Sequence, residues 1–341
     1  MKTHALIAHA GSLRSTLAGF ALLGATVVGG LVGSDTFAPA LTAALALLAL
    51  NCVAALVVHP LLRRRLPLLV AHLALLALVV LVAIGRLSSL DGRFELTQGV
   101  PFDGRLLDAR RGPLHHDALH RLAFRHDGFD IAYAPGRRRG PTHNRVVWKD
   151  GDGALQQAVI GDHRPLVLDG YRIYTSPNKG FAPLLTWQPA AGEPVTGAVH
   201  LPSYPANELR QSREWPLPDG REVWVQLQFD ETLIDPESAG AFRLPGRHRL
   251  AVLVGTQRAE LAPGAGIAID GGTLTYEGLR TWMGYRVSFD PTLPWLLAAA
   301  LLAALALGLH YGLKFFAPAP TAQVAQALAL STPMPTTTHD A

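Results

Sequence analysis

The stretch LPLLVAHLALLALVVLVAI, residues Leu66 to Ile84, sets the architecture of this chain. Its apolar character is interrupted only by Pro67, near its start, and by His72. An α-helix of this length, at about 1.5 Å rise per residue, covers the hydrocarbon core of a bilayer, which is roughly 30 Å thick. The stretch therefore predicts a membrane-spanning helix rather than a helix in a globular core.

His72 is a candidate functional residue because an imidazole inside hydrocarbon is costly unless it is paired, hydrogen-bonded or ligated. It follows the cluster Arg63-Arg64-Arg65 by about six residues, which corresponds to a depth of roughly 9 Å from that end of the helix. The alternative is that His72 only hydrogen-bonds a carbonyl group of the next helix.

Hydrophobic residues make up 49% of the 341 residues, and their distribution is uneven. They are concentrated in three runs near the N-terminus and one near the C-terminus, whereas the middle carries most of the glycine, proline and charge. This distribution predicts a helical membrane bundle and one sizeable water-exposed domain.

Three further stretches have lengths typical of membrane spans: residues 16–33, 40–58 and 293–316. The first of them could also be a signal peptide, since Lys2 and Arg14 precede it. A second apolar run follows after only a short gap, which favours an uncleaved helix. With residues 66–84, the sequence predicts four transmembrane α-helices.

The charges between the spans predict the orientation. Arg63-Arg64-Arg65 lies in a very short loop, where the positive-inside rule is strongest, so this loop is expected in the cytoplasm. Residues 1–15 are then a cytoplasmic N-terminus. Residues 86–292 are exported, and residues 317–341, rich in proline, threonine and alanine, form a disordered cytoplasmic tail.

Residues 86–292 have the texture of a β domain. Segments such as VWVQLQF, HRLAVLV and GYRVSF alternate or are rich in β-branched and aromatic residues, and glycine or proline separates them. Long helical periodicity is absent. We expect a large all-β domain, sandwich-like or barrel-like, between the third and fourth helices.

A second intramembrane histidine, His310, lies about four residues, or roughly 6 Å, from the Lys314 end of the last span. Because the third and fourth spans run in opposite directions, His72 and His310 are expected at similar depths. Two neutral imidazoles at one depth could ligate a haem iron from opposite faces. The helical face of His310 also carries small residues, Ala299, Ala303 and Ala306. The alternatives are a hydrogen bond to a neighbouring helix, or a ring that reaches the interface.

Several other classes of site find no support in the sequence. Cys52 is the only cysteine, so no intramolecular disulfide and no CxxC or CxxCH motif is possible. The net charge of +4 is modest and dispersed, which makes nucleic acid an unexpected partner. No nucleophile, general base or phosphate-binding loop can be assigned, so no catalytic residue is predicted.

Two polar clusters in the middle of the chain are expected to be solvated. The first consists of four histidines in a loop, with no acidic or cysteine residue in ligand spacing: His115, His116, His120 and His126. Contact with a metal or with haem is the alternative for this cluster. The second is Arg137-Arg138-Arg139, between two glycines, which predicts the tip of a β-hairpin. Docking of these arginines on anionic groups is the alternative.

Taken in order, four segments resemble the ResB (CcsB-like) membrane proteins of cytochrome c maturation. They are AHLALLALVVLVAIG with His72, FDIAYAP, PLVLDGYRIYTSPNKGF from Pro165 to Phe181, and GLRTWMGYRVSFDPTLPWLL. The resemblance covers most of residues 10–316. Those proteins act in the haem-attachment pathway called system II.

The resemblance implies an accessory subunit of a haem lyase (cytochrome c synthase) complex in the bacterial cytoplasmic membrane. Its implied partners are a CcsA-type haem-handling membrane protein and an exported apocytochrome c. The tryptophan-rich haem-binding loop of the pathway belongs to the partner. On this interpretation His72 and His310 are candidate axial ligands of a transiently held haem b, and no other metal is expected.

Two other functions stay open at this point. The chain could be a scaffold that fixes the geometry of the partner and never touches haem. It could also be a membrane-anchored binding module unrelated to cytochromes.

Overall fold

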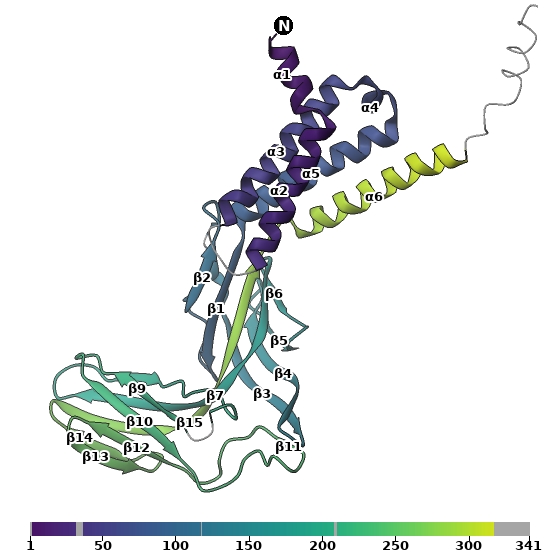
Figure 1. Cartoon of the computed structure of the whole chain (residues 1–341). Helices are drawn as coiled ribbons and strands as arrows, with labels where there is room; N and C mark the ends of the chain where they lie inside the picture. Colours follow the sequence, from purple (N-terminus) through teal and green to yellow (C-terminus); the bar gives the residue numbers. More distant parts are fainter. Residues whose placement is uncertain (1, 32–36, 117, 208–209, 317–341) are drawn as a thin grey trace, which may run out of the picture. The chain divides into compact units, whose positions relative to one another are not determined.

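The computed structural model describes residues 2–31, 37–116, 118–207 and 210–316. It divides into two compact units, one of helices and one of strands (Figure 1). The helical unit comprises Met1–Gly85 and Thr292–Ala341, and the β unit comprises Arg86–Pro291. The proposed tail at 317–341 lies outside the described residues.

The helical unit contains four helices that are long and apolar enough to cross a membrane, at Leu13–Gly30, Ala40–Val58, Leu66–Ser88 and Leu293–Phe315. This confirms the prediction of four apolar helices. The helices, in chain order, are α1 (Lys2–Ala10), α2 (Leu13–Leu31), α3 (Phe37–Val58), α4 (Pro60–Arg64), α5 (Leu66–Ser88) and α6 (Leu293–Phe315).

Polar contacts hold the junction between α1 and α2 against α3. Asn51 is buried in α3, and its Nδ2 donates to the carbonyl oxygen of Ala10 over 2.6 Å. Its Oδ1 accepts from the Thr16 hydroxyl over 2.8 Å. Because a buried amide is costly when unpaired, this asparagine specifies how the first helices pack.

The β unit confirms the prediction of a large all-β domain. Its described strands form three antiparallel sheets. One short 3₁₀ helix, η1 (Leu119–Arg121), also occurs in this unit. In chain order the strands are β1 (Leu90–Thr97), β2 (Asp108–Arg111), β3 (Phe124–Ala134), β4 (Arg138–Lys149), β5 (Leu155–Ile160), β6 (Leu166–Leu168), β7 (Tyr171–Pro189), β8 (Val195–Ala198), β9 (Ser212–Pro216), β10 (Glu222–Gln228), β11 (Gly240–Ala241), β12 (Arg249–Val254), β13 (Gln257–Leu261), β14 (Gly266–Ile269) and β15 (Gly272–Phe289).

The largest sheet is built around two long strands, β7 and β15, which pair with each other (Figure 1). Its order is β2-β1-β15-β7-β6, and β14 and β8 add to the other ends of β15 and β7. The two four-stranded sheets have the orders β13-β12-β10-β9 and β11-β3-β4-β5. Bulges interrupt the β7–β15 ladder at Tyr276/Gly278 and Met283/Tyr285.

Alternating side chains give the three sheets one continuous hydrophobic core. In β1, Phe94 and Leu96 are buried while Arg93 is exposed. The Phe94 ring stacks on Tyr285 of β15, with centroids 5.1 Å apart. Full burial of such a side chain contributes about 1.5–3 kcal/mol, so the alternation fixes which face of each strand is inward.

Candidate functional site

The ring of His72 is hydrogen-bonded within its own helix, α5. Its Nδ1 lies 2.8 Å from the carbonyl oxygen of Leu68, one turn earlier. Because a carbonyl group can only accept, Nδ1 carries the proton and donates it. The lone pair of the neutral ring is then on Nε2. No hydrogen bond to this Nε2 occurs among the residues that the structure describes.

The backbone at His72 also contacts α3. The Cys52 thiol donates a weak hydrogen bond to the His72 carbonyl oxygen over 3.4 Å. The neighbours of the histidine on α5, Ala71 and Ala74, are buried, and His72 itself is half-buried. The imidazole is thus positioned by its own helix, and the backbone beside it contacts α3.

His310 lies on α6, where it is half-buried and its ring is 5.3 Å from the ring of Tyr311. The three alanines on its helical face, Ala299, Ala303 and Ala306, are the buried residues of α6. Within the described helices, no hydrogen bond or ring contact joins His310 to His72. The pairing of the two histidines stays a prediction.

The hydrogen bonding of His72 is compatible with the chemistry of haem ligation, whereas that of His310 is not defined by a contact of its ring nitrogens in the described part of the chain. Such a ligand needs a neutral imidazole with one unprotonated nitrogen directed away from its own helix. The Leu68 carbonyl fixes this tautomer at His72. The helical face of His310 carries small, buried alanines, which would allow a neighbouring helix or a flat group to approach closely.

The expectation that His126 is solvated is wrong. His126 is fully buried in β3, where its Nδ1 accepts hydrogen bonds from Asn144 Nδ2 at 2.7 Å and from the Gly128 backbone N–H at 3.2 Å. Its Nε2 lies 3.4 Å from the Thr281 hydroxyl. The phenol of Tyr285 completes the network by donating to Asn144 Oδ1 over 2.7 Å.

This network keeps His126 neutral. Desolvation by burial, with a smaller contribution from the charge of Arg145, lowers the pKa of His126 to about 3. Sequence reasoning treated the histidine-rich segment as one loop. The alternation of Phe124 and His126 on one face of a strand was the signal that could have placed the ring inward.

The other three histidines of the cluster lie in or beside a loop. His115 is half-buried: its Nδ1 donates to the carbonyl oxygen of Ser88 over 2.9 Å, and its Nε2 accepts from the Tyr171 hydroxyl over 3.1 Å. His116 and His120 are exposed, as expected. Among the described residues, no group of three or more histidine, cysteine, aspartate or glutamate side chains is arranged to hold a metal ion.

The arginine-rich turn is the tip of the β3–β4 hairpin, as predicted. Arg139, however, is not simply solvated. Its Nη2 donates to Asp162 Oδ1 over 2.8 Å, and both side chains are about one quarter exposed (26%). Partial burial raises the pKa of Asp162, but hydrogen bonds from Arg139 and Thr175 outweigh this effect and hold the pKa below its ordinary value.

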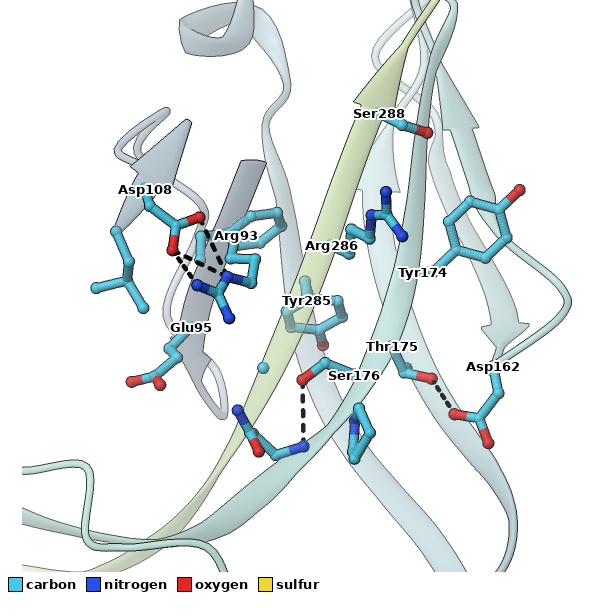
Figure 2. Close-up of a pocket in the computed structure, with 15 residues that line it drawn as sticks. Arg93, Glu95, Asp108, Asp162, Tyr174, Thr175, Ser176, Tyr285, Arg286 and Ser288 are labelled. Carbon is cyan, nitrogen blue, oxygen red and sulfur yellow. Dashed lines mark hydrogen bonds and ion pairs between the residues drawn. The ribbon is translucent and has the colours of Figure 1, made fainter. Parts of the chain in front are cut away.

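A cavity of about 820 Å³ on the outer face of the largest sheet was not predicted (Figure 2). Arg93 of β1 faces Arg286 of β15 directly in the ladder. Like charges in this position repel, and each arginine is paired with a carboxylate. Arg93 donates through Nε and Nη2 to Asp108, and Arg286 in the same way to Asp91. These arginines are therefore committed to ion pairs within the sheet.

A buried amine lies near the hairpin tip. Lys179 of β7 is 4% exposed, and its Nζ donates to the carbonyl oxygen of Pro177 over 3.2 Å and lies 5.6 Å from the Tyr133 ring centroid. Desolvation, together with the charge of Arg139, lowers the pKa of Lys179 to about 8. Nothing in the local sequence SPNKGF distinguishes this lysine from an exposed one.

Four apolar helices joined to a large all-β unit indicate a multi-pass membrane protein with one sizeable β domain. The sequence profile of the ResB-like family matches residues 62–314, which is most of the chain. The chain therefore belongs to the ResB-like family, and this membership associates it with cytochrome c biogenesis. No curated protein matches the chain.

Proposed function

We propose that this chain is a subunit of a cytochrome c maturation complex that assists haem delivery across the membrane and haem attachment to an exported apocytochrome c. The observation that carries the proposal is the state of His72, whose Nδ1 donates to Leu68 while Nε2 keeps its lone pair. An imidazole in an apolar helix marks a candidate functional site, and an unprotonated ring nitrogen is the atom that iron ligation requires.

In this proposal α2, α3, α5 and α6 cross the bacterial cytoplasmic membrane. The cluster Arg63-Arg64-Arg65 lies in the cytoplasm, and the β unit lies on the extracytoplasmic side. His72 and His310 then share the cytoplasmic half of the bilayer, where haem would enter.

Within the proposed site, the two histidines hold the cargo and the partner completes the chemistry. His72 and His310 would hold a haem b through their imidazole nitrogens, and the haem iron would supply the site that these nitrogens ligate. Leu68 fixes the tautomer of His72, and the small alanines on the helical face of His310 would allow a flat group to approach closely. A CcsA-type membrane protein, rather than this chain, would supply the groups that attach haem to apocytochrome c.

A scaffold without haem contact is the second candidate, and one observation favours it for the β unit. The buried polar groups around His126 and Asn144 bond one another, which is typical of a structural core. On this alternative His72 tolerates glutamine, which can hydrogen-bond but ligates iron poorly. If the chain were a membrane-anchored binding module unrelated to cytochromes, no CcsA-type protein would co-purify with it.

Co-purification with the CcsA-type partner, followed by absorption spectroscopy, tests the proposal. The wild-type complex is expected to show a haem Soret band. The double variant His72→Ala, His310→Ala is expected to lose it, while the exposed control His116→Ala retains it. A colourless wild-type complex, or a double variant with undiminished haem, would reject the ligand assignment.

Orientation is tested separately in intact cells. In a Cys52→Ser background, a cysteine replacing the exposed Asp152 is expected to react with a membrane-impermeant maleimide applied from outside. Replacement of Arg64 by cysteine is expected to give no reaction until the cells are lysed. Labelling in the opposite order would place the β unit in the cytoplasm and overturn the topology.

A further inference from the structure

The edge strands of the β unit differ in the features that prevent another strand from pairing with them. β2, β9 and β13 carry charged side chains, in the sequences DARR, SREWP and QRAEL. β6, β8, β11 and β14 have at most 4 residues. Charges and short length are the usual means by which proteins prevent another chain from pairing with a sheet edge.

β5 lacks both protections. It has 6 residues, LQQAVI, with no charge and no proline, and it ends the order β11-β3-β4-β5. Its ladder with β4 has no bulge. Leu155 is 68% exposed and Val159 is 44% exposed. Among the described residues, β5 is therefore the longest edge strand without a charged side chain.

The free side of β5 presents backbone groups to solvent. Its ladder is formed with β4 alone, and no other backbone hydrogen bond in the described part of the chain involves 155–160. A strand with one unpaired edge can accept a further strand through main-chain hydrogen bonds. This geometry fits an extended polypeptide rather than a small molecule.

The two faces of the sheet at β5 differ in chemistry. On the inner face, Ala158 and Trp148 are partly buried and pack against the core, so an apolar side chain added beside them would complete their burial. On the outer face, Leu155 lies opposite Lys149 and Val159 lies opposite Arg145.

Basic groups flank the outer face of β5. The acids nearby are Asp162, which is paired with Arg139, and Asp150 and Asp152 of the β4–β5 turn. Arg145 is paired with Asp130, but Lys149 and Arg164 form no ion pair within the described residues. Arg164 lines a cavity of about 530 Å³ that reaches Val159. The nearest acid in the β4–β5 turn, Asp150, accepts hydrogen bonds from Gln156 and from two backbone N–H groups of the turn.

We propose that β5 is a docking edge for an extended segment of a partner protein, which pairs with it as an additional strand. The segment carries apolar side chains on the face of Ala158 and acidic side chains on the face of Lys149. This surface is separate from the histidines of the membrane helices and does not depend on their role.

A labelled peptide of alternating glutamate and valine tests the docking edge. Fluorescence anisotropy with the full chain in neutral detergent at low salt is expected to show binding about tenfold tighter than for the lysine–valine peptide, since two exposed charge contacts contribute about that much. The fully N-methylated peptide keeps its side chains but has no backbone donors, and it is expected not to bind.

Charge reversal supplies the matched control. The variant Lys149→Glu, Arg164→Glu is expected to reverse the preference between the two peptides, whereas Arg258→Glu on the edge strand β13 leaves it unchanged. Slower hydrogen exchange at the 155–160 amides is expected only with the acidic peptide. Absence of binding, retained binding of the N-methylated peptide, or an unchanged preference in the double variant would overturn the proposal.

Discussion

Two histidines show how differently the two units use the same side chain. His126, in the β unit, is fully buried and has hydrogen-bond partners at both ring nitrogens. His72, in the helical unit, is half-buried and directs one nitrogen to its own helix. The first has the environment of a structural residue. The second differs in being only half-buried and in having no hydrogen bond to its Nε2 among the described residues.

The largest expected difference between these histidines is in stability. His126→Ala leaves one N–H of the Asn144 amide and the N–H of Gly128 without their acceptor in the core, which costs about 2–4 kcal/mol. His72→Ala removes only a hydrogen bond within α5 and is expected to cost less than about 1 kcal/mol. Unfolding of the full chain in detergent, followed by circular dichroism for the helices and by tryptophan fluorescence for the β unit, measures both. Equal losses would remove the distinction.

Acid is expected to destabilise the β unit through His126. Its pKa is lowered to about 3 in the fold, so between pH 6.5 and 3 the unfolded chain binds a proton that the folded chain does not. Stability therefore falls as the pH is lowered through this window, by up to about 1.4 kcal/mol per pH unit from this group. His126→Gln, which cannot titrate, is expected to flatten the dependence; an unchanged slope would show that other groups cause it.

Lys179 should make stability depend on pH in the same direction as His126, but in the alkaline range. Its pKa is lowered to about 8, so the folded chain releases a proton between pH 8 and 10.5 while the unfolded chain keeps it. Stability is expected to rise across this window. Lys179→Met is expected to raise the unfolding midpoint at pH 7, because it removes a buried charge with no carboxylate bonded to it. A lower midpoint would indicate that the ammonium group is required.

The smallest effect is expected at the outer face of the sheet. The hydrogen bond from Arg93 lowers the pKa of Asp108, but both side chains are more than half exposed (66% and 51%). Water and salt screen such a pair, so Asp108→Asn is expected to leave the unfolding midpoint almost unchanged at physiological ionic strength. A clear loss of stability would show that the repulsion between Arg93 and Arg286 matters more than we infer.

The elements themselves were predictable because composition determines them. Leu66–Ser88 is long and apolar enough that no tertiary contact is needed to specify a helix, and strands such as β10 show their alternation directly. The hairpin tip at Arg137 was marked by the flanking glycines. These are local properties, and a single sequence contains them.

Features that depend on register were not predictable. The facing of Arg93 and Arg286 requires β1 and β15, which are far apart in the chain, to pair in one register. The burial of Lys179 follows from which strand face meets the core, and no local pattern marks it. His126 differs, because its alternation with Phe124 already indicated an inward ring. For the candidate site, the sequence located His72 but could not show that Leu68 accepts its Nδ1 proton, because this depends on the rotamer of the ring.

The most direct test of the account compares His72 with another histidine of the helical unit. His59 donates through Nε2 to the carbonyl oxygen of Gly11 over 3.3 Å and serves as the matched control. In complexes purified with the CcsA-type partner, His72→Ala is expected to lower the Soret absorbance per chain by at least about tenfold. His59→Ala is expected to leave it at the wild-type level. Equal haem content in the two variants would contradict the central claim that His72 is a haem ligand.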